Sequence, residues 1–237
     1  MIFALLNENQ LLKSLKTIYQ EHNFLAANYW KTIRLTVNSL HFTFIPEEFY
    51  LPEENTKYLQ LAAGKILIDK EQIFDYHHSK FGTVGVFGIE KEVMNWFKEM
   101  YPAKKISPVH LLNTMIEGIL QEKKPNGMHL YFEEGFVSMI YFKDNKLQFC
   151  NKFAYKTTQD LVYHVLFVMN ELGLQNAETP VIFYGEITMF SEGYVMLARS
   201  LKNICFAKNP NKLIYSQYFD QLPEHRYFSL FSSYFLY

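Results

Sequence analysis

The sequence predicts an α/β protein of two related halves, with mixed sheets and flanking helices. Residues 128–207 read as three strands, a helix, a strand, a helix and a strand. Residues 1–123 repeat part of that order, and the polar segment KKPNG at 123–127 separates the two. We therefore expect a first half at residues 1–124, with an inserted hairpin near 65–88, and a second half at 128–237.

The second half opens with a predicted meander of strands at 128–134, 136–143 and 147–155. Gly135 and the pair Asp144-Asn145 are residues typical of its two tight turns. Thr157 followed by Asp160 predicts a capping box at the start of a helix that Gly173 ends. The run VIFY at 181–184 is apolar throughout, which favours a parallel strand buried on both faces. A helix at 190–201 and a strand at 203–207 complete the order.

Only the strand-like residues 1–6 precede the first helix of the first half, at 7–22, so we expect either an abridged copy or a chain that starts inside a longer gene product. Strands at 32–39 and 41–46 follow, and then the hairpin. Residues 89–100 have the pattern of an amphipathic helix. After a short strand at 104–107, we expect a last helix at 108–123 with Pro108 in its first turn.

Composition excludes several classes of protein. The net charge is -1, with 23 basic and 24 acidic residues and no basic block, so we expect no nucleic-acid partner. No apolar run approaches the ~18 residues that span a bilayer, so we expect no membrane insertion. The N-terminus lacks the pattern of a signal peptide, and two cysteines in apolar runs suit buried thiols. These features predict a cytoplasmic protein.

The duplicated halves with a hairpin inserted in the first resemble the actin-like ATPase superfamily, whose halves have the ribonuclease-H-like fold. The actin homologues of pilus assembly are similar in style. HFTFIPEEFY at 41–50, CNKFAYKTTQDLVYHVL at 150–166 and VIFYGEI at 181–187 resemble a family of actin-like-fold proteins from Bacteroidetes-type bacteria. The resemblance covers most of the chain and brings no biochemical role with it.

The resemblance implies three nucleotide positions. The first phosphate loop would lie in an opening hairpin that the first half does not contain. The second phosphate loop falls at residues 133–138, where Glu133 replaces an aspartate and Gly135 is kept. The adenosine position is a pair of glycines after the fourth strand, and here it is Gly185-Glu186. The candidate nucleotide-binding residues are Glu133, Glu134, Gly135, Ser138, Gly185 and Glu186.

Electrostatics weighs against a nucleotide at these positions. A carboxylate ~4 Å from a phosphate charge costs on the order of 4 kcal/mol at an effective dielectric of ~20. We therefore expect a non-catalytic actin-like scaffold with no cofactor, no metal and no catalytic residue. The alternative is a diverged nucleotide-binding actin-like ATPase that uses ATP and Mg²⁺ in the cleft between the halves. A ribonuclease-H-like nuclease would need several converging carboxylates, which the strand starts do not supply.

Gly185 and Glu186 carry a specific expectation. A strand that ends in glycine lets backbone approach whatever occupies the cleft, because no Cβ stands in the way. We expect Glu186 to fill part of that space and to meet a basic or hydrogen-bond-donating group from the other half.

Two other patterns have a structural explanation. Gly82, Gly85 and Gly88 precede a helix, but their spacing is that of no phosphate-binding loop, and a twisted hairpin explains them. His77 and His78 would point to opposite faces of a strand and so cannot share a metal ion. We expect both to be solvated hairpin residues.

A protein partner is expected to contact aromatic side chains. Tyr163 and Phe167 lie four residues apart on the predicted helix, away from its main apolar stripe. Packing between the halves is the simpler explanation for that pair, and a protein-docking surface is the functional alternative. Near the C-terminus, Phe228, Phe231 and Phe235 fit a helical stripe that begins near Pro223. Tyr234 and Tyr237 are left over as candidate contact residues.

Overall fold

The structure is a computed structural model that describes residues 8–27, 29–64, 70–123 and 125–236. The chain divides into two compact units, residues 1–113 and 114–237. The strand expected at residues 1–6 and part of the first hairpin strand lie outside the described residues. The second unit begins at Thr114, inside a helix, whereas the linker at 123–127 had been expected to separate the halves.

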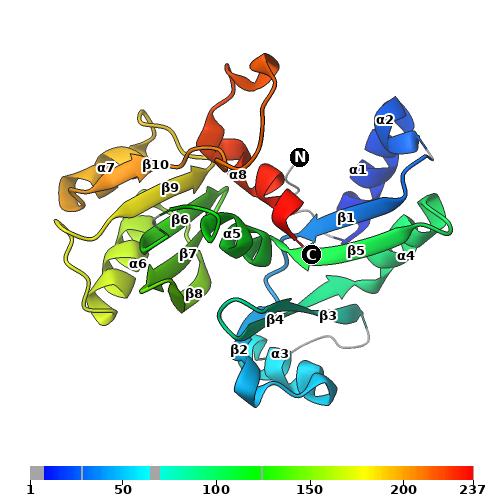
Figure 1. Cartoon of the computed structure of the whole chain (residues 1–237), viewed down its shortest axis with the longest axis horizontal. Helices are drawn as coiled ribbons and strands as arrows, with labels where there is room; N and C mark the ends of the chain where they lie inside the picture. The colour runs from blue at the N-terminus through cyan, green and yellow to red at the C-terminus, as the bar shows by residue number, and fades with distance from the viewer. Residues whose placement is uncertain (1–7, 28, 65–69, 124, 237) are drawn as a thin grey trace. The chain divides into compact units, whose positions relative to one another are not determined.

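The described residues of the first unit form two sheets and the helices α1 to α4 (Figure 1). One sheet is a parallel pair, and the other is antiparallel with the order β2-β4-β3. The strands are β1 (Thr32–Val37), β2 (Phe42–Pro46), β3 (Glu71–His78), β4 (Thr83–Glu90) and β5 (Lys105–His110). The helices are α1 (Glu8–Glu21), α2 (Asn23–Ala26), α3 (Asn55–Ala63) and α4 (Lys91–Met100), and 3-10 turns lie at Glu47–Phe49 and Pro52–Glu54. The hairpin β3-β4 is present where the sequence predicted an insertion.

Two features of the first unit differ from the prediction. Helix α3 was missed, although its Leu59 is fully buried against Val84 and Val86 of β4. Pro108 lies in β5, paired with Leu35 of β1, and not in the first turn of a helix. Helix α5 (Leu111–Ile119) begins after His110, whose Nδ1 accepts a hydrogen bond from the Leu112 N–H at 3.2 Å. A histidine side chain thus satisfies an amide at the helix start, where proline had been expected.

The second unit is built on one five-stranded mixed sheet with the order β10-β9-β6-β7-β8. Its strands are β6 (Gly127–Glu133), β7 (Phe136–Lys143), β8 (Lys146–Ala154), β9 (Val181–Gly185) and β10 (Ile204–Phe206). The helices after α5 are α6 (Thr158–Glu171), α7 (Glu192–Ser200) and α8 (Glu224–Ser232), and 3-10 turns lie at Gln217–Phe219 and Ser233–Phe235. β9 runs parallel to both of its neighbours, as its apolar sequence predicted.

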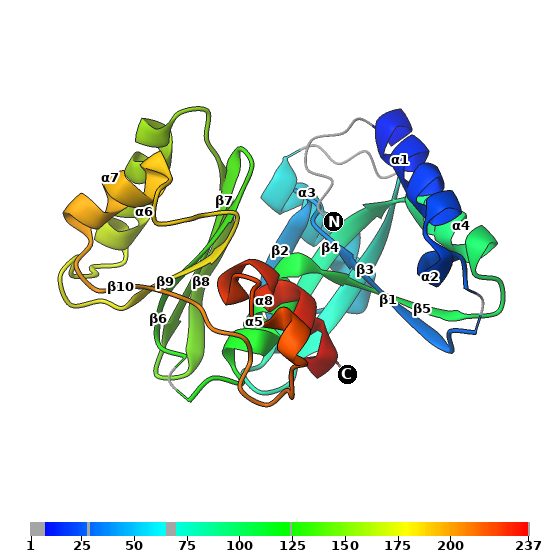
Figure 2. The ribbon, with the colours of Figure 1, turned by 90° about the horizontal axis from the view of Figure 1, so that it is seen from above.

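Helices cover both faces of this sheet (Figure 2). α6 and α7 bury one face through a core that includes Leu130, Val165 and Phe183. The side chains of Thr157 and Asp160 form the predicted capping box at the start of α6. α8 lies on the other face, where the Phe228 ring centroid is 4.7 Å from that of Tyr184. α5 packs there too, because a Cβ on Gly118 would overlap the Ser232 side chain and lie 2.9 Å from Phe228.

Candidate functional site

The residues of the two expected nucleotide positions in the second unit lie on neighbouring strands. β6 pairs with β7 on one side and with β9 on the other, and Phe132 of β6 is opposite Gly185 of β9. The Glu186 N–H donates to the Phe132 carbonyl at 2.8 Å. The β6–β7 turn therefore lies next to the carboxyl end of β9, where the central strands of the sheet end.

Tyr155 stabilises the β6–β7 turn through two hydrogen bonds. Its N–H donates to the Gly135 carbonyl at 2.9 Å, and its hydroxyl donates to the Glu133 carbonyl at 3.0 Å. Gly135 has a φ of 72°, the left-handed conformation for which glycine was expected. Glu134, at the tip, is exposed.

Glu133 is a buried residue that forms an ion pair with Lys152 of β8. The Lys152 Nζ lies 2.9 Å from Oε2 of Glu133, and both side chains are almost fully buried. The ammonium also lies 4.8 Å from the centroid of the Phe136 ring. Burial lowers the pKa of Lys152, and the charge of Glu133 opposes that shift. Lys152 was not predicted, because its only signal in the sequence is a lone lysine inside an otherwise strand-like run.

Ser138 lies beside this ion pair rather than at the turn. It is opposite Tyr131 of β6 and Lys152 of β8, so these three side chains share one face of the sheet with Glu133. Ser138 is fully buried, and its Oγ has no hydrogen-bond partner among the described residues. The structure therefore brings Glu133 and Ser138 together, whereas Glu134 and Glu186 are exposed.

His129 and Tyr131, on the same face of the sheet as Glu133, stay neutral at physiological pH. Burial lowers the pKa of His129 to about 4. Its Nε2 donates to the Pro125 carbonyl at 2.7 Å, so its Nδ1 accepts from the Tyr184 hydroxyl at 2.8 Å. Burial raises the pKa of Tyr131 to about 12, and a hydrogen bond with Ser229 partly offsets this shift. Neither group supplies a charge.

Gly185 is required by the backbone of its own sheet. Its φ is 80°, and a Cβ there would overlap the carbonyl oxygen of Phe132. The expectation had been that glycine leaves room for a molecule in a cleft. The close neighbour that the structure shows is instead β6, so this glycine allows β9 to turn away from β6 at its end.

Glu186 has the basic partner that was expected, but the partner comes from the same unit. Arg226 of α8 binds both carboxylate oxygens through its Nη2, at 2.8 and 2.9 Å, and donates from Nε to Oε1 at 3.2 Å. His225 Nε2 donates to the Ile187 carbonyl at 2.8 Å. The Asn209 N–H donates to a Glu224 oxygen, also at 2.8 Å. The first turn of α8 is thus tied to the carboxyl end of β9 and to the segment after β10.

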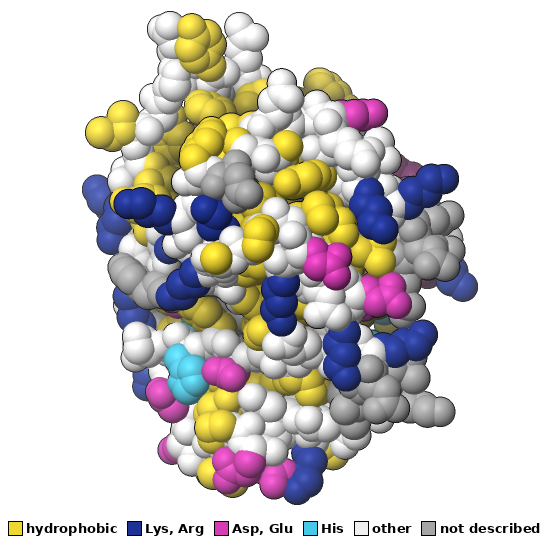
Figure 3. All heavy atoms as spheres, turned by 90° about the vertical axis from the view of Figure 1, so that its right-hand side faces the viewer, with side chains coloured by type: hydrophobic (Ala, Val, Ile, Leu, Met, Phe, Trp, Pro, Cys, Tyr) yellow, Lys and Arg dark blue, Asp and Glu magenta, His cyan; other side chains and the backbone are white. Residues whose placement is uncertain are grey.

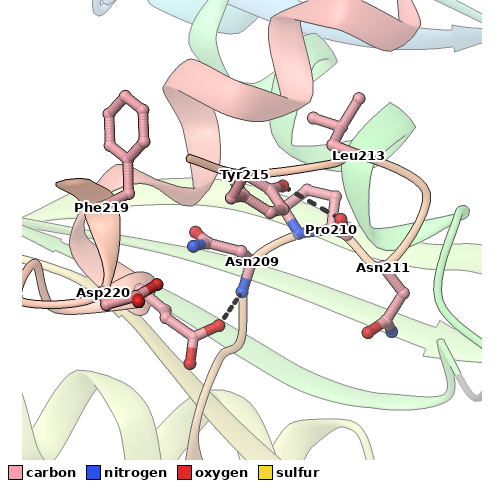
Figure 4. A pocket seen from close by; sticks show the side chains of 8 residues that line it. Asn209, Pro210, Asn211, Leu213, Tyr215, Phe219 and Asp220 are labelled. Carbon is pink, nitrogen blue, oxygen red and sulfur yellow. Dashed lines mark hydrogen bonds between the residues drawn. The ribbon is translucent and has the colours of Figure 1, made fainter. Parts of the chain in front are cut away.

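A cavity of about 380 Å³ lies between that segment and α8 (Figure 4). None of the predicted nucleotide-binding residues lines it. The amide of Asn209 lies among its lining side chains, and its Oδ1 is buried without a hydrogen-bond partner in the described part of the chain. The lining residues are Asn209, Pro210, Asn211, Leu213, Tyr215, Phe219, Asp220 and Glu224.

Three of the four candidate contact residues can be placed. Tyr163 and Phe167 are exposed on α6, with their rings stacked at a centroid distance of 5.7 Å. Tyr234 is exposed after α8, and Tyr237 lies outside the described residues. The nearby Phe228 and Phe235 are buried, as the predicted stripe required.

The first unit has an aromatic cluster that the sequence analysis did not identify. The ring of Trp30 lies 4.4 Å from that of Phe24 and 4.5 Å from that of Tyr29, and the latter two are exposed. Figure 3 shows one face of the molecule, on which exposed hydrophobic side chains lie among both basic and acidic side chains. The aromatic residues of this segment follow neither a helical nor a strand period, so pattern analysis passes over them.

The histidines of the β3–β4 hairpin differ in environment. His77 is exposed, with its Nε2 3.4 Å from an Asp75 oxygen. His78 had been expected to be solvated, but it is buried, and its Nε2 lies 3.0 Å from Oδ1 of Asn113. Gly85 lies in β4 directly beneath Asn113, where a Cβ would overlap that amide. The hairpin thus packs onto its own unit.

Comparison with known proteins identifies the family. A family model described as "Protein of unknown function (DUF3822)" matches residues 2–204. The chain belongs to the DUF3822 family. No curated protein sequence matches it significantly. Among the described residues of this DUF3822 protein, no helix is long and apolar enough to cross a membrane.

Solved structures confirm the actin-like ATPase fold of this DUF3822 protein. A Bacteroides thetaiotaomicron protein with actin-like ATPase fold and unknown function has a TM-score of 0.73 and 21% identity. That match covers 83% of this chain and 76% of the other. A PilM–PilN type IV pilus biogenesis complex matches with a TM-score of 0.56 and 12% identity, over 96% of this chain and 85% of the other. The predicted resemblances to Bacteroidetes-type proteins and to pilus-assembly actin homologues are both confirmed.

Proposed function

We propose that this protein is a non-catalytic scaffold with an actin-like fold that acts through protein–protein contacts. One observation carries the proposal. Glu186, at the position where the ATPases have their second glycine, is held by three hydrogen bonds from Arg226. The first turn of α8 is therefore bound to the residues just after β9, at the place where adenosine binds in the ATPases.

The β6–β7 turn supports the same proposal. The Lys152 ammonium is buried against Glu133, so it cannot reach out to a phosphate. The exposed charge at the tip belongs to Glu134, which would repel one. The two charge-bearing features of the turn thus offer no attraction for a nucleotide, and we propose that the protein needs no cofactor.

A protein partner is the remaining part of the proposal. The structurally similar PilM is described in complex with PilN, and an actin-like fold without nucleotide is compatible with such a role. Cys150 is partly buried and Cys205 is exposed, whereas both were expected to be buried. Both are free thiols, which suits a reducing compartment such as the cytoplasm.

Equilibrium dialysis with ATP and Mg²⁺ tests this proposal. We expect the wild type neither to retain nor to hydrolyse ATP. Arg226→Ala together with Glu186→Gly should remove the ion pair between these two side chains. Any weak nucleotide binding should appear only in this double variant. Arg199→Ala, which removes an arginine from the last turn of α7, is the control for the loss of positive charge. Magnesium-dependent turnover by the wild type that Glu133→Gln abolishes would overturn the scaffold in favour of the ATPase.

A further inference from the structure

β8 is an edge strand with an unused side. In the order β10-β9-β6-β7-β8 it pairs with β7 alone, and no strand among the described residues pairs with its other side. An edge of this kind presents backbone N–H and C=O groups to which another extended chain can bind. The β8 edge therefore needs an explanation.

Two hydrogen bonds show which amides of β8 face outward. The Tyr155 N–H, just after the strand, donates to Gly135 on the β7 side. The Lys152 N–H donates at 2.8 Å to Oδ1 of the adjacent Asn151 and so is not used by β7. Because amide directions alternate along a strand, the amides of Cys150 and Ala154 also point to the free side. Asn151 occupies one of these donors with a side-chain oxygen that a peptide carbonyl can replace.

A continuous row of aromatic rings runs from β8 onto α6. Phe149 stacks on Phe153 at 6.4 Å, and Phe153 stacks on His164 of α6 at 5.3 Å. The His164 ring lies 5.7 Å from that of Tyr163, which in turn stacks on Phe167. We call these five side chains the aromatic ledge. Tyr163 is 62% exposed and Phe167 48%, which is unusual for large stacked rings and leaves apolar area for a ligand.

Exposed lysines outnumber exposed acidic residues along the edge. Residues 146–156 contain three lysines and no acidic residue. Lys152 is neutralised by Glu133, which leaves exposed Lys146 at the start of β8 and Lys156 just after its end. Nearby Asp160 is occupied, since its carboxylate accepts hydrogen bonds from the Lys156 and Thr157 amides at 3.1 and 3.0 Å. Exposed Lys143, at the end of β7, adds to the positive charge. The exposed acidic residues beside the strand are Asp144, in the β7–β8 turn, and Glu134, in the β6–β7 turn next to Tyr155.

We infer that the β8 edge binds an extended, acidic segment of a partner protein by strand addition. Its backbone pairs with the outward amides of Lys152 and Ala154. Alternate apolar side chains rest on the aromatic ledge. Acidic side chains toward the two ends of the segment meet Lys146, which the register shift in β8 places on the ledge face, and Lys156. This inference rests on the proposed scaffold function and names the chemistry of the partner.

A second copy of this chain fits the edge less well. Two β8 strands paired antiparallel about Asn151 would place Lys146 of each copy opposite Lys156 of the other. Like charges directly opposite in a sheet are destabilising. An acidic strand from a different protein has no such conflict.

The test uses the full chain and labelled peptides of about ten residues, a length that matches a long strand. One peptide alternates valine with glutamate, a second alternates valine with lysine, and binding is followed by fluorescence anisotropy. We expect the glutamate peptide to bind at least about tenfold more tightly, a difference of about 1.4 kcal/mol. It should also slow hydrogen exchange of the Lys152 and Ala154 amides.

Two variants locate the contact. Ala154→Pro removes one outward amide and leaves the β7 side unchanged, and Tyr163→Ser with Phe167→Ser removes the exposed part of the ledge. Each should weaken binding at least about fivefold. Phe190→Ser, at an 87% exposed aromatic outside the ledge, should not. Circular dichroism confirms that each variant folds.

Equal binding of both peptides, absence of binding, or indifference to Ala154→Pro and to the ledge variant would each overturn the inference. A dimer in sedimentation that Ala154→Pro dissolves would replace the acidic segment with a second copy. These outcomes leave the proposed function standing, because they involve no nucleotide. Magnesium-dependent ATP turnover would remove the proposed function without affecting peptide binding at β8.

Discussion

At the scale of single residues, acidic side chains of the second unit pair with basic side chains from other elements: Glu133 with Lys152 of β8, and Glu186 with Arg226 of α8. The sequence singled out Glu133, Gly135 and Glu186. In the structure Glu133 forms a buried ion pair, Gly135 has a left-handed backbone conformation, and Glu186 forms an exposed ion pair. The partners Lys152 and Arg226 come from other elements, and pattern analysis within one segment gives no sign of which lysine or arginine will meet which acid. Burial explains why they meet: a charge taken out of water needs an opposite charge beside it.

The buried ion pair gives the first prediction. Lys152→Met should lower the free energy of unfolding by about 3–5 kcal/mol, because it leaves the Glu133 carboxylate buried without its counter-charge. Urea denaturation monitored by circular dichroism measures this loss. Glu133→Gln combined with Lys152→Met removes both charges and should restore most of the lost stability. If the double variant were as unstable as the single one, packing rather than charge would explain the effect.

Protonation of His129 gives the second prediction. Its pKa is about 4 in the folded protein and near 6.5 when unfolded, so the unfolded state takes up the proton first as the pH falls. The stabilising contribution is complete above pH ~6.5 and is lost on descent to pH ~4, by on the order of 3 kcal/mol. His129→Gln should flatten the curve of unfolding free energy against pH in that window. His77→Gln, at an exposed site, is the control, and equal flattening in both would contradict this account.

At the scale of elements, hydrophobic periodicity and turn residues predicted the order of strands and helices in the second unit. The meander, the capping box and the buried parallel strand each depend on neighbours within a few residues, which sequence patterns record. α3 was missed because a single buried leucine, Leu59, anchors it to β4. Pro108 was misassigned because a proline fits the first turn of a helix and a strand that lacks one donor equally well.

The approach of β9 to β6 gives the third prediction. Gly185→Ala should cost several kcal/mol, since the new Cβ meets both a left-handed φ and the Phe132 carbonyl. Gly173→Ala is a matched control, with a φ of 65° and no atom within 4 Å of a Cβ. It should cost only about 1 kcal/mol for the backbone conformation. If Gly185→Ala and Gly173→Ala lowered the free energy of unfolding equally, the backbone of β6 would be shown to shift and accommodate the new Cβ.

At the scale of the whole molecule, the sequence predicted two α/β parts and the actin-like fold, but it placed their boundary at the polar linker. The compact units divide at residue 113, because Gly118 of α5 packs on Phe228 and Ser232 of the second unit. A polar segment marks where the chain is exposed to solvent. The unit to which a helix belongs depends instead on the apolar surface against which the helix packs. That surface lies more than a hundred residues away in the sequence.

Truncation gives the fourth prediction. A fragment that begins at Thr114 should fold with the five-stranded sheet intact, since it keeps the α5 residues that cover α8. A fragment that begins at Met128 should melt at least about 5 °C lower, because Phe228 and its neighbours lose that cover. Thermal denaturation of the two fragments measures the difference. Identical melting temperatures would assign α5 to the first part of the chain instead.

The position of β6 at the centre of its sheet has a consequence during synthesis. β7 and β8 follow it immediately, so the meander can form as soon as they leave the ribosome. β9, which closes the other side of β6, comes roughly fifty residues later, a delay of about 3–10 s at ordinary rates of translation. For that interval the apolar backbone of β6 is open on one side in a crowded cell. The nascent chain is then at its most prone to aggregate, and slower translation between α6 and β9 would lengthen the exposure.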